Sequence, residues 1–193
     1  MAILPIQIAP HPVLKRVADP VDKIDDKIRT LMDSMLETMY NAPGIGLAAP
    51  QIRESVRIMV VDVDQPREDD DVPPDAATIA KRRVKPRFFI NPEIIWSSEE
   101  PNVYEEGCLS LPGQYAEVER PKKIRVKYLD YDGQLQELEA SGLLATCVQH
   151  EIDHLNGILF IDHLSSLKRD MTLRKLKKWV KENPDEIAEK HIL

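Results

Sequence analysis

Two histidines stand four residues apart in the segment HEIDHLNGILF, residues 150–160, and a glutamate directly follows the first of them. On a helix, His150 and His154 lie on one face one turn apart, so both imidazoles can bind the same metal ion. Glu151 stands where it could act as a general acid and base beside that ion. The pattern is H-E-x-x-H, the zinc-binding motif of a large class of metalloproteases, and it predicts a metal site.

A catalytic metal site takes three protein ligands and keeps one position open, so the two histidines need a partner. The extended protease motif would supply a histidine at position 160, where this chain has Phe160. Cys108 in EEGCLSLPG, residues 105–113, is the best candidate, because Gly107 beside it indicates an unusual backbone and its thiolate would complete a Cys/His/His site. Alternatively, Cys108 is a buried thiol in a turn. The other candidate ligands are His163, the terminal His11 and His191, and a glutamate on a later helix.

Length and composition indicate one ordinary globular domain. The chain has 193 residues, of which 42% are hydrophobic and 31% are charged. No run approaches the roughly 20 apolar residues of a membrane span, and the N-terminus lacks the pattern of a signal peptide, so a cytoplasmic location away from membranes is expected. Two cysteines are too few for a disulfide framework, and a net charge of −7 argues against DNA as a partner.

Hydrophobic periodicity predicts the elements that must position the metal ligands. Apolar residues between positions 22 and 41 recur at steps of one, three and four, which predicts a helix with Asp22 or Asp25 as N-cap. Strands are expected over 56–63, 87–96 and 123–131. Asp132-Gly133 then offers a hairpin turn into another strand, with a bulge near Leu135 and Leu138.

A buried helix is expected over 141–157, capped by Ser141 and ended by Gly157, and an amphipathic helix over 165–181. Between them, these elements predict an α+β fold, with antiparallel or mixed sheets around a central metal-binding helix and a helix at the C-terminus. Segment 64–86 contains several prolines and charge clusters, and is expected to be a mobile surface loop.

Three segments together resemble the signature motifs of the peptide deformylase family, in that family's order: GIGLAAPQ (44–51), EGCLS (106–110) and QHEIDH (149–154). The resemblance implies one catalytic domain over residues 1–193, with 64–86 as an insertion. It also implies a hydrolase that removes the formyl group from the N-terminal formylmethionine of nascent peptides and releases formate.

The resemblance assigns roles to the residues of these motifs. Cys108, His150 and His154 would bind one divalent metal, which the family implies to be Fe²⁺ in the cell, with Zn²⁺, Ni²⁺ or Co²⁺ as substitutes. Glu151 would take the proton of the attacking water. The Gln51 side-chain amide and the Leu109 backbone N–H would stabilise the oxyanion.

The resemblance also implies how the formylmethionyl peptide is bound. The methionine pocket would be lined by Ile45, Thr146 and Cys147, while Gly46 and Gly107 offer backbone hydrogen bonds to the peptide. Thr146 stands where many members carry an aliphatic residue, and Tyr115 departs from an arginine common near that place.

Outside the motifs, two charge patterns have alternative interpretations. Glu106 and Arg120 form a candidate pair that steadies the cysteine loop, or else an ordinary surface ion pair. The helix over 165–181 is basic, and this face is either solvated or a docking surface for the ribosome. Its basic residues are Lys168, Arg169, Arg174, Lys175, Lys177, Lys178 and Lys181.

Two other functions fit the motif less well. A zinc endopeptidase would need the missing third histidine. A structural metal module would need a fourth ligand and no acid such as Glu151 beside the metal.

Overall fold

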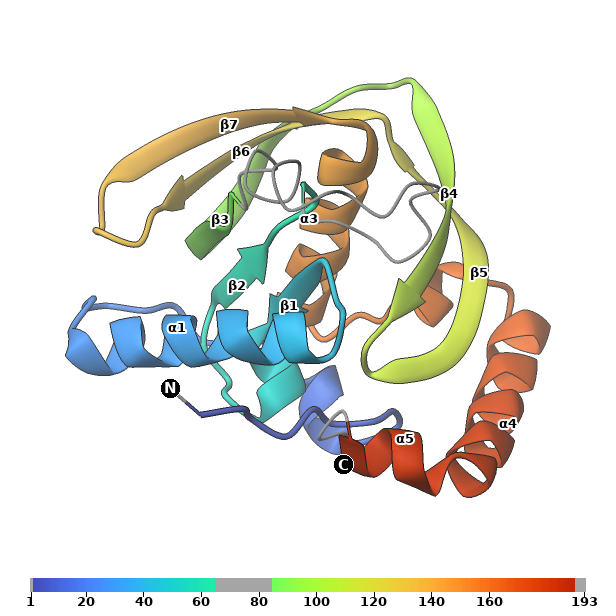
Figure 1. Ribbon diagram of the computed structural model, residues 1–193. Helices are drawn as coiled ribbons and strands as arrows, with labels where there is room; N and C mark the ends of the chain where they lie inside the picture. The colour runs from blue at the N-terminus through green and yellow to red at the C-terminus, as the bar shows by residue number, and fades with distance from the viewer. Residues whose placement is uncertain (1, 65–84, 190–193) are drawn as a thin grey trace, which may run out of the picture.

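The structure is a computed structural model that describes residues 2–64 and 85–189 (Figure 1). Its strands are β1 (Gly46–Ala48), β2 (Ile58–Val61), β3 (Arg87–Ser97), β4 (Pro101–Cys108), β5 (Leu111–Pro121), β6 (Lys123–Leu129) and β7 (Leu135–Ser141). Its α-helices are α1 (Asp26–Asn41), α3 (Gly142–Leu155), α4 (Ser166–Glu182) and α5 (Pro184–Glu189). Short 3₁₀ helices are η1 (Pro12–Lys15), η2 (Ala49–Ile52) and η3 (Phe160–His163).

The strands form two antiparallel sheets. Five of them pair in the order β1-β2-β3-β6-β7, and β4 and β5 form a separate hairpin. Figure 1 shows the hairpin beside α4 and the larger sheet curving over α3. The predicted α+β class is confirmed.

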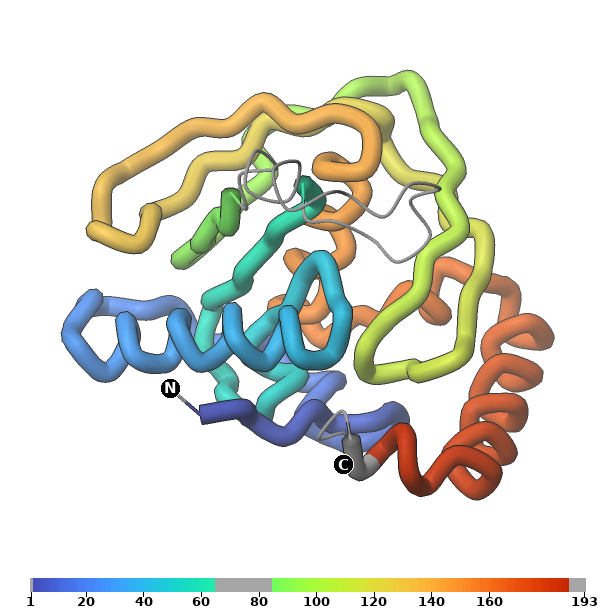
Figure 2. The backbone as a smooth tube through the Cα atoms, in the orientation of Figure 1, coloured from blue at the N-terminus to red at the C-terminus, as the bar shows by residue number. Residues whose placement is uncertain are grey.

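Helix α3 lies at the centre of the molecule and follows β7 directly (Figure 2). Its apolar side, which includes Val148 and Leu155, packs on Phe89, Ile124 and Val126 of the larger sheet. Burial of each such side chain stabilises the fold by about 1.5–3 kcal/mol. The helix that carries the candidate metal ligands is therefore fixed by the main core, as its nearly continuous apolar sequence predicts.

The β4–β5 hairpin has a core of its own, shared with α4 and η3. Leu111, Val118, Phe160 and Leu176 are buried in this cluster, and Cys108 packs against it. Phe160 is thus a core residue, and the hairpin turn that carries Cys108 is held by α4.

Several element boundaries differ from the expected ones. Helix α1 begins at Asp26, because the Asp25 side chain accepts hydrogen bonds from the Lys27 and Ile28 N–H groups and caps the helix. Ser141 occupies the N-cap position of α3 but makes no capping hydrogen bond with its side chain. Gly157 follows the end of α3 with φ of +72°, as expected of a glycine there.

The expected bulge in β7 is wrong, since its pairing with β6 is continuous from Ser141 to Leu135. The irregularities lie instead in β3, where the register with β6 shifts on either side of Glu93 and Ile94. Pro92 has no N–H to donate to the ladder at that place. The hairpin β4–β5 and helix α5 were not expected.

The expected insertion loop, 64–86, lies outside the described residues except for Asp64, Lys85 and Pro86. Within the described part of the chain, no helix is long and apolar enough to cross a membrane.

Candidate active site

The H-E-x-x-H motif lies on the buried last two turns of α3. His150, Glu151 and His154 are 8%, 4% and 1% exposed, and the two imidazole rings lie with their centroids 5.0 Å apart. The rings therefore lie one turn apart on a single face, as the spacing predicts.

Cys108 reaches this face from the end of β4. Its register with β5 shifts between Gly107 and Cys108, which turns the thiol toward α3. The Cys108 Sγ atom lies 3.2 Å from His154 Nε2. Among the described residues, Cys108, His150 and His154 form a group whose ligand atoms all lie within 4.8 Å of one another.

This donor set fits a divalent metal ion. A thiolate and two imidazoles suit iron, cobalt, nickel or zinc, and a site with three protein ligands would keep a position for water or substrate. The other candidate ligands lie elsewhere: His11 caps η1, His163 binds Asp153, and His191 is outside the described residues.

Glu106 and Arg120 form a buried network behind His150. Glu106 Oε2 lies 2.8 Å from His150 Nδ1, and Arg120 donates to both Glu106 oxygens, at 2.5 and 3.0 Å. Burial alone would raise the pKa of Glu106, but the hydrogen bonds from His150 and Arg120 outweigh it and lower this pKa, so Glu106 stays ionised. The pair is buried, so its interpretation as a surface ion pair is wrong. By contrast, His154 Nδ1 has no hydrogen-bond partner among the described residues.

The Glu151 carboxyl group faces the pocket with one oxygen unsatisfied. Its Oε2 atom is buried and has no hydrogen-bond partner in the described part of the chain. Burial raises the pKa of Glu151 to about 7, so the group can both accept and return a proton near neutral pH. Such an environment is typical of a general acid and base.

Gln51 is held in one orientation on η2. Its Oε1 atom accepts a hydrogen bond from the Ala48 N–H at 2.8 Å. Its Nε2 atom therefore points the other way, donating to Ser110 Oγ at 3.1 Å and lying 3.6 Å from Cys108 Sγ. The amide N–H is thus aimed beside the candidate metal site, and Ser110, which sequence reasoning did not single out, helps to aim it.

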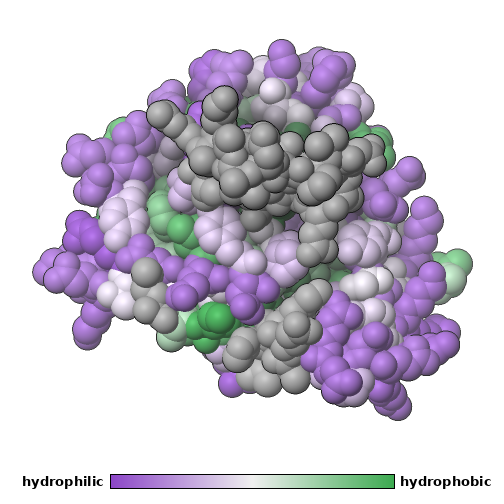
Figure 3. Space-filling view, viewed as in Figure 1, coloured by the Kyte–Doolittle hydropathy of each residue, from purple (hydrophilic) through white to green (hydrophobic). Residues whose placement is uncertain are grey.

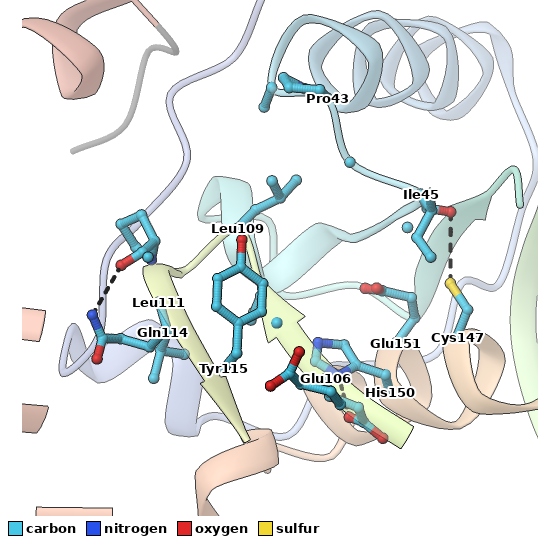
Figure 4. A pocket seen from close by; sticks show the side chains of 18 of the residues that line it. Pro43, Ile45, Glu106, Leu109, Leu111, Gln114, Tyr115, Cys147, His150 and Glu151 are labelled. Carbon is cyan, nitrogen blue, oxygen red and sulfur yellow. Dashed lines mark hydrogen bonds and ion pairs between the residues drawn. The ribbon is translucent and has the colours of Figure 1, made fainter. Parts of the chain in front are cut away.

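A pocket of about 750 Å³ opens onto these residues (Figure 4). Of the residues predicted for the site, all except His154 line it: Ile45, Gly46, Gln51, Gly107, Cys108, Leu109, Thr146, Cys147, His150 and Glu151. In Figure 4, Cys147 lies beside Ile45, whose carbonyl accepts a hydrogen bond from the Cys147 thiol at 3.6 Å. The fold therefore brings together three segments that are far apart in the sequence.

A model of the polypeptide deformylase family matches residues 3–170. The chain belongs to this family. It is 56% identical to the peptide deformylase of Mesorhizobium japonicum over 182 residues, which cover 94% of this chain and 96% of that protein. The peptide deformylase of Rhizobium meliloti is 55% identical over 181 residues, with 94% and 96% covered.

Solved structures of peptide deformylases have the same fold as this chain. The peptide deformylase of Legionella pneumophila superposes with a TM-score of 0.83 at 42% identity, covering 95% of this chain and 99% of that one. That of Ehrlichia chaffeensis in complex with actinonin gives 0.81 at 41% identity, covering 93% and 98%. The chain is accordingly a metal-dependent hydrolase of the family that removes the N-formyl group from nascent polypeptides, which confirms the resemblance of the three motifs.

Proposed function

We propose that Cys108, His150 and His154 hold one divalent metal ion, at which the formyl group of N-formylmethionyl peptides is hydrolysed. The observation that supports this most strongly is the convergence of their three ligand atoms within 4.8 Å, next to the unsatisfied carboxylate oxygen of Glu151. A bound divalent ion would polarise the formyl oxygen as a Lewis acid and lower the pKa of a water molecule.

Glu151 would accept the proton of the attacking water and pass it to the amine as the formyl C–N bond breaks. The products are formate and a peptide with a free N-terminus. Negative charge that develops on the formyl oxygen would be stabilised by the Gln51 Nε2–H and the Leu109 backbone N–H. Gln51 needs little reorganisation for this, because Ala48 and Ser110 already fix its amide.

The pocket suits an unbranched apolar side chain at the N-terminus. Ile45, Thr146 and Cys147 would surround the methionine side chain, while Gly46 and Gly107 would hydrogen-bond the peptide backbone. Thr146 makes this surface slightly more polar than an aliphatic residue would.

Formate release from formyl-Met-Ala-Ser tests the proposal, with protein purified without oxygen or loaded with nickel. We expect activity in the wild type and its near loss in Cys108→Ala and Glu151→Ala. The Glu151→Ala protein should still contain its metal, since Glu151 is not a ligand. An inert wild type with metal bound at this site would refute the proposal.

We further propose that the ion in the cell is Fe²⁺. A thiolate ligand makes a ferrous site sensitive to oxygen, because both the iron and the sulfur can be oxidised. Protein purified without oxygen should contain iron, and its activity should decay in air, while nickel-loaded protein should remain active. Iron-free, air-stable activity in anaerobic preparations would contradict this assignment.

We also propose that helix α4 is a docking surface on the ribosome, where nascent peptides emerge, and that the enzyme acts in the cytoplasm. Only Leu176 of this helix is fully buried, and six of its seven basic residues are exposed. In Figure 3, hydrophilic side chains gather at the lower right, where Figure 1 places α4. Co-sedimentation with ribosomes should be lost in the charge-reversed double variant Arg174→Glu/Lys178→Glu, and unchanged binding would exclude docking through α4.

A further inference from the structure

A continuous chain of hydrogen bonds joins the exposed side of η3 to His150. His163 Nε2 lies 2.7 Å from Asp153 Oδ2, and Arg120 Nη1 donates to that same oxygen at 2.8 Å. Arg120 then donates through Nε and Nη2 to Glu106, whose Oε2 atom lies 2.8 Å from His150 Nδ1. Four segments of the fold meet in this chain: η3, α3, β5 and β4.

The direction of each hydrogen bond follows from the chemistry of the groups. An ionised carboxylate only accepts, so His163 donates to Asp153 from Nε2, and His150 donates to Glu106 from Nδ1. All three guanidinium nitrogens of Arg120 are engaged, two with Glu106 and one with Asp153. The Arg120 side chain is 6% exposed, so water competes little for these bonds.

Arg120 therefore lies between two carboxylates that compete for it. The hydrogen bond from His163 satisfies part of the acceptor capacity of the Asp153 carboxylate, and this weakens the hydrogen bond between Asp153 and Arg120. Without that donor, Arg120 would shift toward Asp153 and hold Glu106 less firmly. Glu106 in turn sets the tautomer and ring orientation of His150, as a hydrogen-bonded carboxylate does for a metal-ligating histidine.

The 3₁₀ helix η3, which carries His163 toward Asp153, is held in place by contacts of its other residues. Within η3, Asp162 accepts a hydrogen bond from the Leu159 N–H at 2.7 Å and pairs with Lys15. Phe160, at the start of η3, stacks on the His150 ring with 6.2 Å between centroids. The η3 turn that carries His163 is thus anchored both to η1 and to α3.

We propose that His163 is a positioning residue, which acts through Asp153 and Arg120 to hold Glu106 and the His150 ring in place for the metal. The inference rests on the metal site proposed above. His163 touches neither the ligands nor the substrate pocket, so its effect is on the stability and geometry of the metal site rather than on peptide binding.

A matched pair of variants tests this. His163→Met and His163→Gln have side chains of similar length, but only the glutamine can donate to Asp153. Cobalt-loaded protein is mixed with excess chelator, and its cobalt absorption spectrum and rate of metal release are measured. Mutation of a residue that hydrogen-bonds a metal ligand typically lowers metal affinity 10–100-fold. His163 is more distant, so we expect His163→Met to release metal roughly three- to ten-fold faster than the wild type, with an altered cobalt spectrum.

His163→Gln should restore both the release rate and the spectrum toward those of the wild type. Thermal unfolding of the metal-free proteins checks that the variants fold, and KM for the formyl peptide should stay unchanged. Wild-type release from His163→Met, or equal impairment in both variants, would overturn the inference.

The route through Asp153 is tested by a double-mutant cycle. Asp153→Leu leaves no side-chain acceptor at position 153, so if His163 acts through Asp153, adding His163→Met to Asp153→Leu should cause no further acceleration of metal release. Independent, multiplying effects would show that His163 does not act through Asp153 and would overturn the proposed route. A wild type that binds no cobalt would instead overturn the metal site itself, so the two failures are distinguishable.

Discussion

The Glu151 carboxylate lies against the backbone of Gly46, in space that the Cβ atom of any other residue at position 46 would occupy. A Cβ atom added at position 46 would lie 2.8 Å from Glu151 Cδ and 2.9 Å from Cys147 Sγ. Gly46 is therefore part of what sets the position of Glu151, in addition to its proposed backbone contact with the peptide.

Gly46→Ala should displace Glu151. Because misplacing a catalytic group by about 1 Å can lower a rate on the order of 100-fold, we expect a loss of kcat/KM of that size, with the metal content unchanged. Gly44→Ala is the control, since the three atoms nearest to its Cβ would all belong to the flexible Leu109 side chain, the first of them 2.6 Å away. An equal loss of activity in both variants would contradict the role of the Glu151 contact.

Gln51→Glu should remove an oxyanion donor while keeping the shape of the side chain. We expect kcat to fall about 100- to 1,000-fold, as when one oxyanion-hole donor is removed, with little change in KM. Ser110→Ala only frees the amide to move and should reduce kcat by a much smaller factor. Steady-state kinetics with formyl-Met-Ala-Ser measures both, and a larger effect on KM than on kcat would argue against oxyanion stabilisation.

Arg120→Leu should destabilise the fold and weaken metal binding together. Removing one partner of a buried ion pair typically costs about 3–5 kcal/mol of unfolding free energy, because it leaves the other charge uncompensated. Arg125 on β6 provides the control: its pair with Glu139 is exposed, at 3.9 Å, and such pairs contribute only about 0–1 kcal/mol. Urea unfolding of Arg120→Leu and Arg125→Leu compares the two, and similar losses would mean that burial of the Arg120 network matters little.

Gly113→Ala should loosen α4 from the hairpin that carries Cys108. Gly113 has φ of +68°, and an added Cβ would lie 2.5 Å from Trp179 Nε1 of α4. Gly133→Ala serves as the matched control, since it has a similarly positive φ of +81° but would meet only Ile24, at 3.2 Å. Overpacking typically costs about 1–3 kcal/mol, so Gly113→Ala should lose that much more unfolding free energy than Gly133→Ala. Equal losses would show that the contact with Trp179 is easily rearranged.

Local periodicity was enough to predict much of the metal helix. His150 and His154 share a face because of the four-residue spacing, and the apolar residues around them require burial whatever the rest of the fold does. Asp25 and Gly157 likewise mark helix ends through local capping and a positive φ.

The sequence did not predict the β4–β5 hairpin, because the buried face of this hairpin is not apolar. Glu106, Gln114 and Arg120 are all buried there, which breaks the alternation that identifies a half-buried strand. These residues can be buried only because partners on α3 and across the hairpin satisfy them, and hydrophobic patterning does not report such partners.

The amino-acid sequence was sufficient to predict a metal-binding helix, and the order of three motifs indicated the family. The sequence predicted that Cys108 joins the two histidines and that Glu106 pairs with Arg120. Two contacts became known only from the folded chain: Ser110 aims Gln51, and Arg120 also binds Asp153. Both contacts join residues far apart along the chain: Ser110 follows β4 and meets Gln51 of η2, while Arg120 of β5 meets Asp153 of α3. A one-residue change of register would turn each strand side chain to the opposite face, so spacing along the chain cannot specify these contacts.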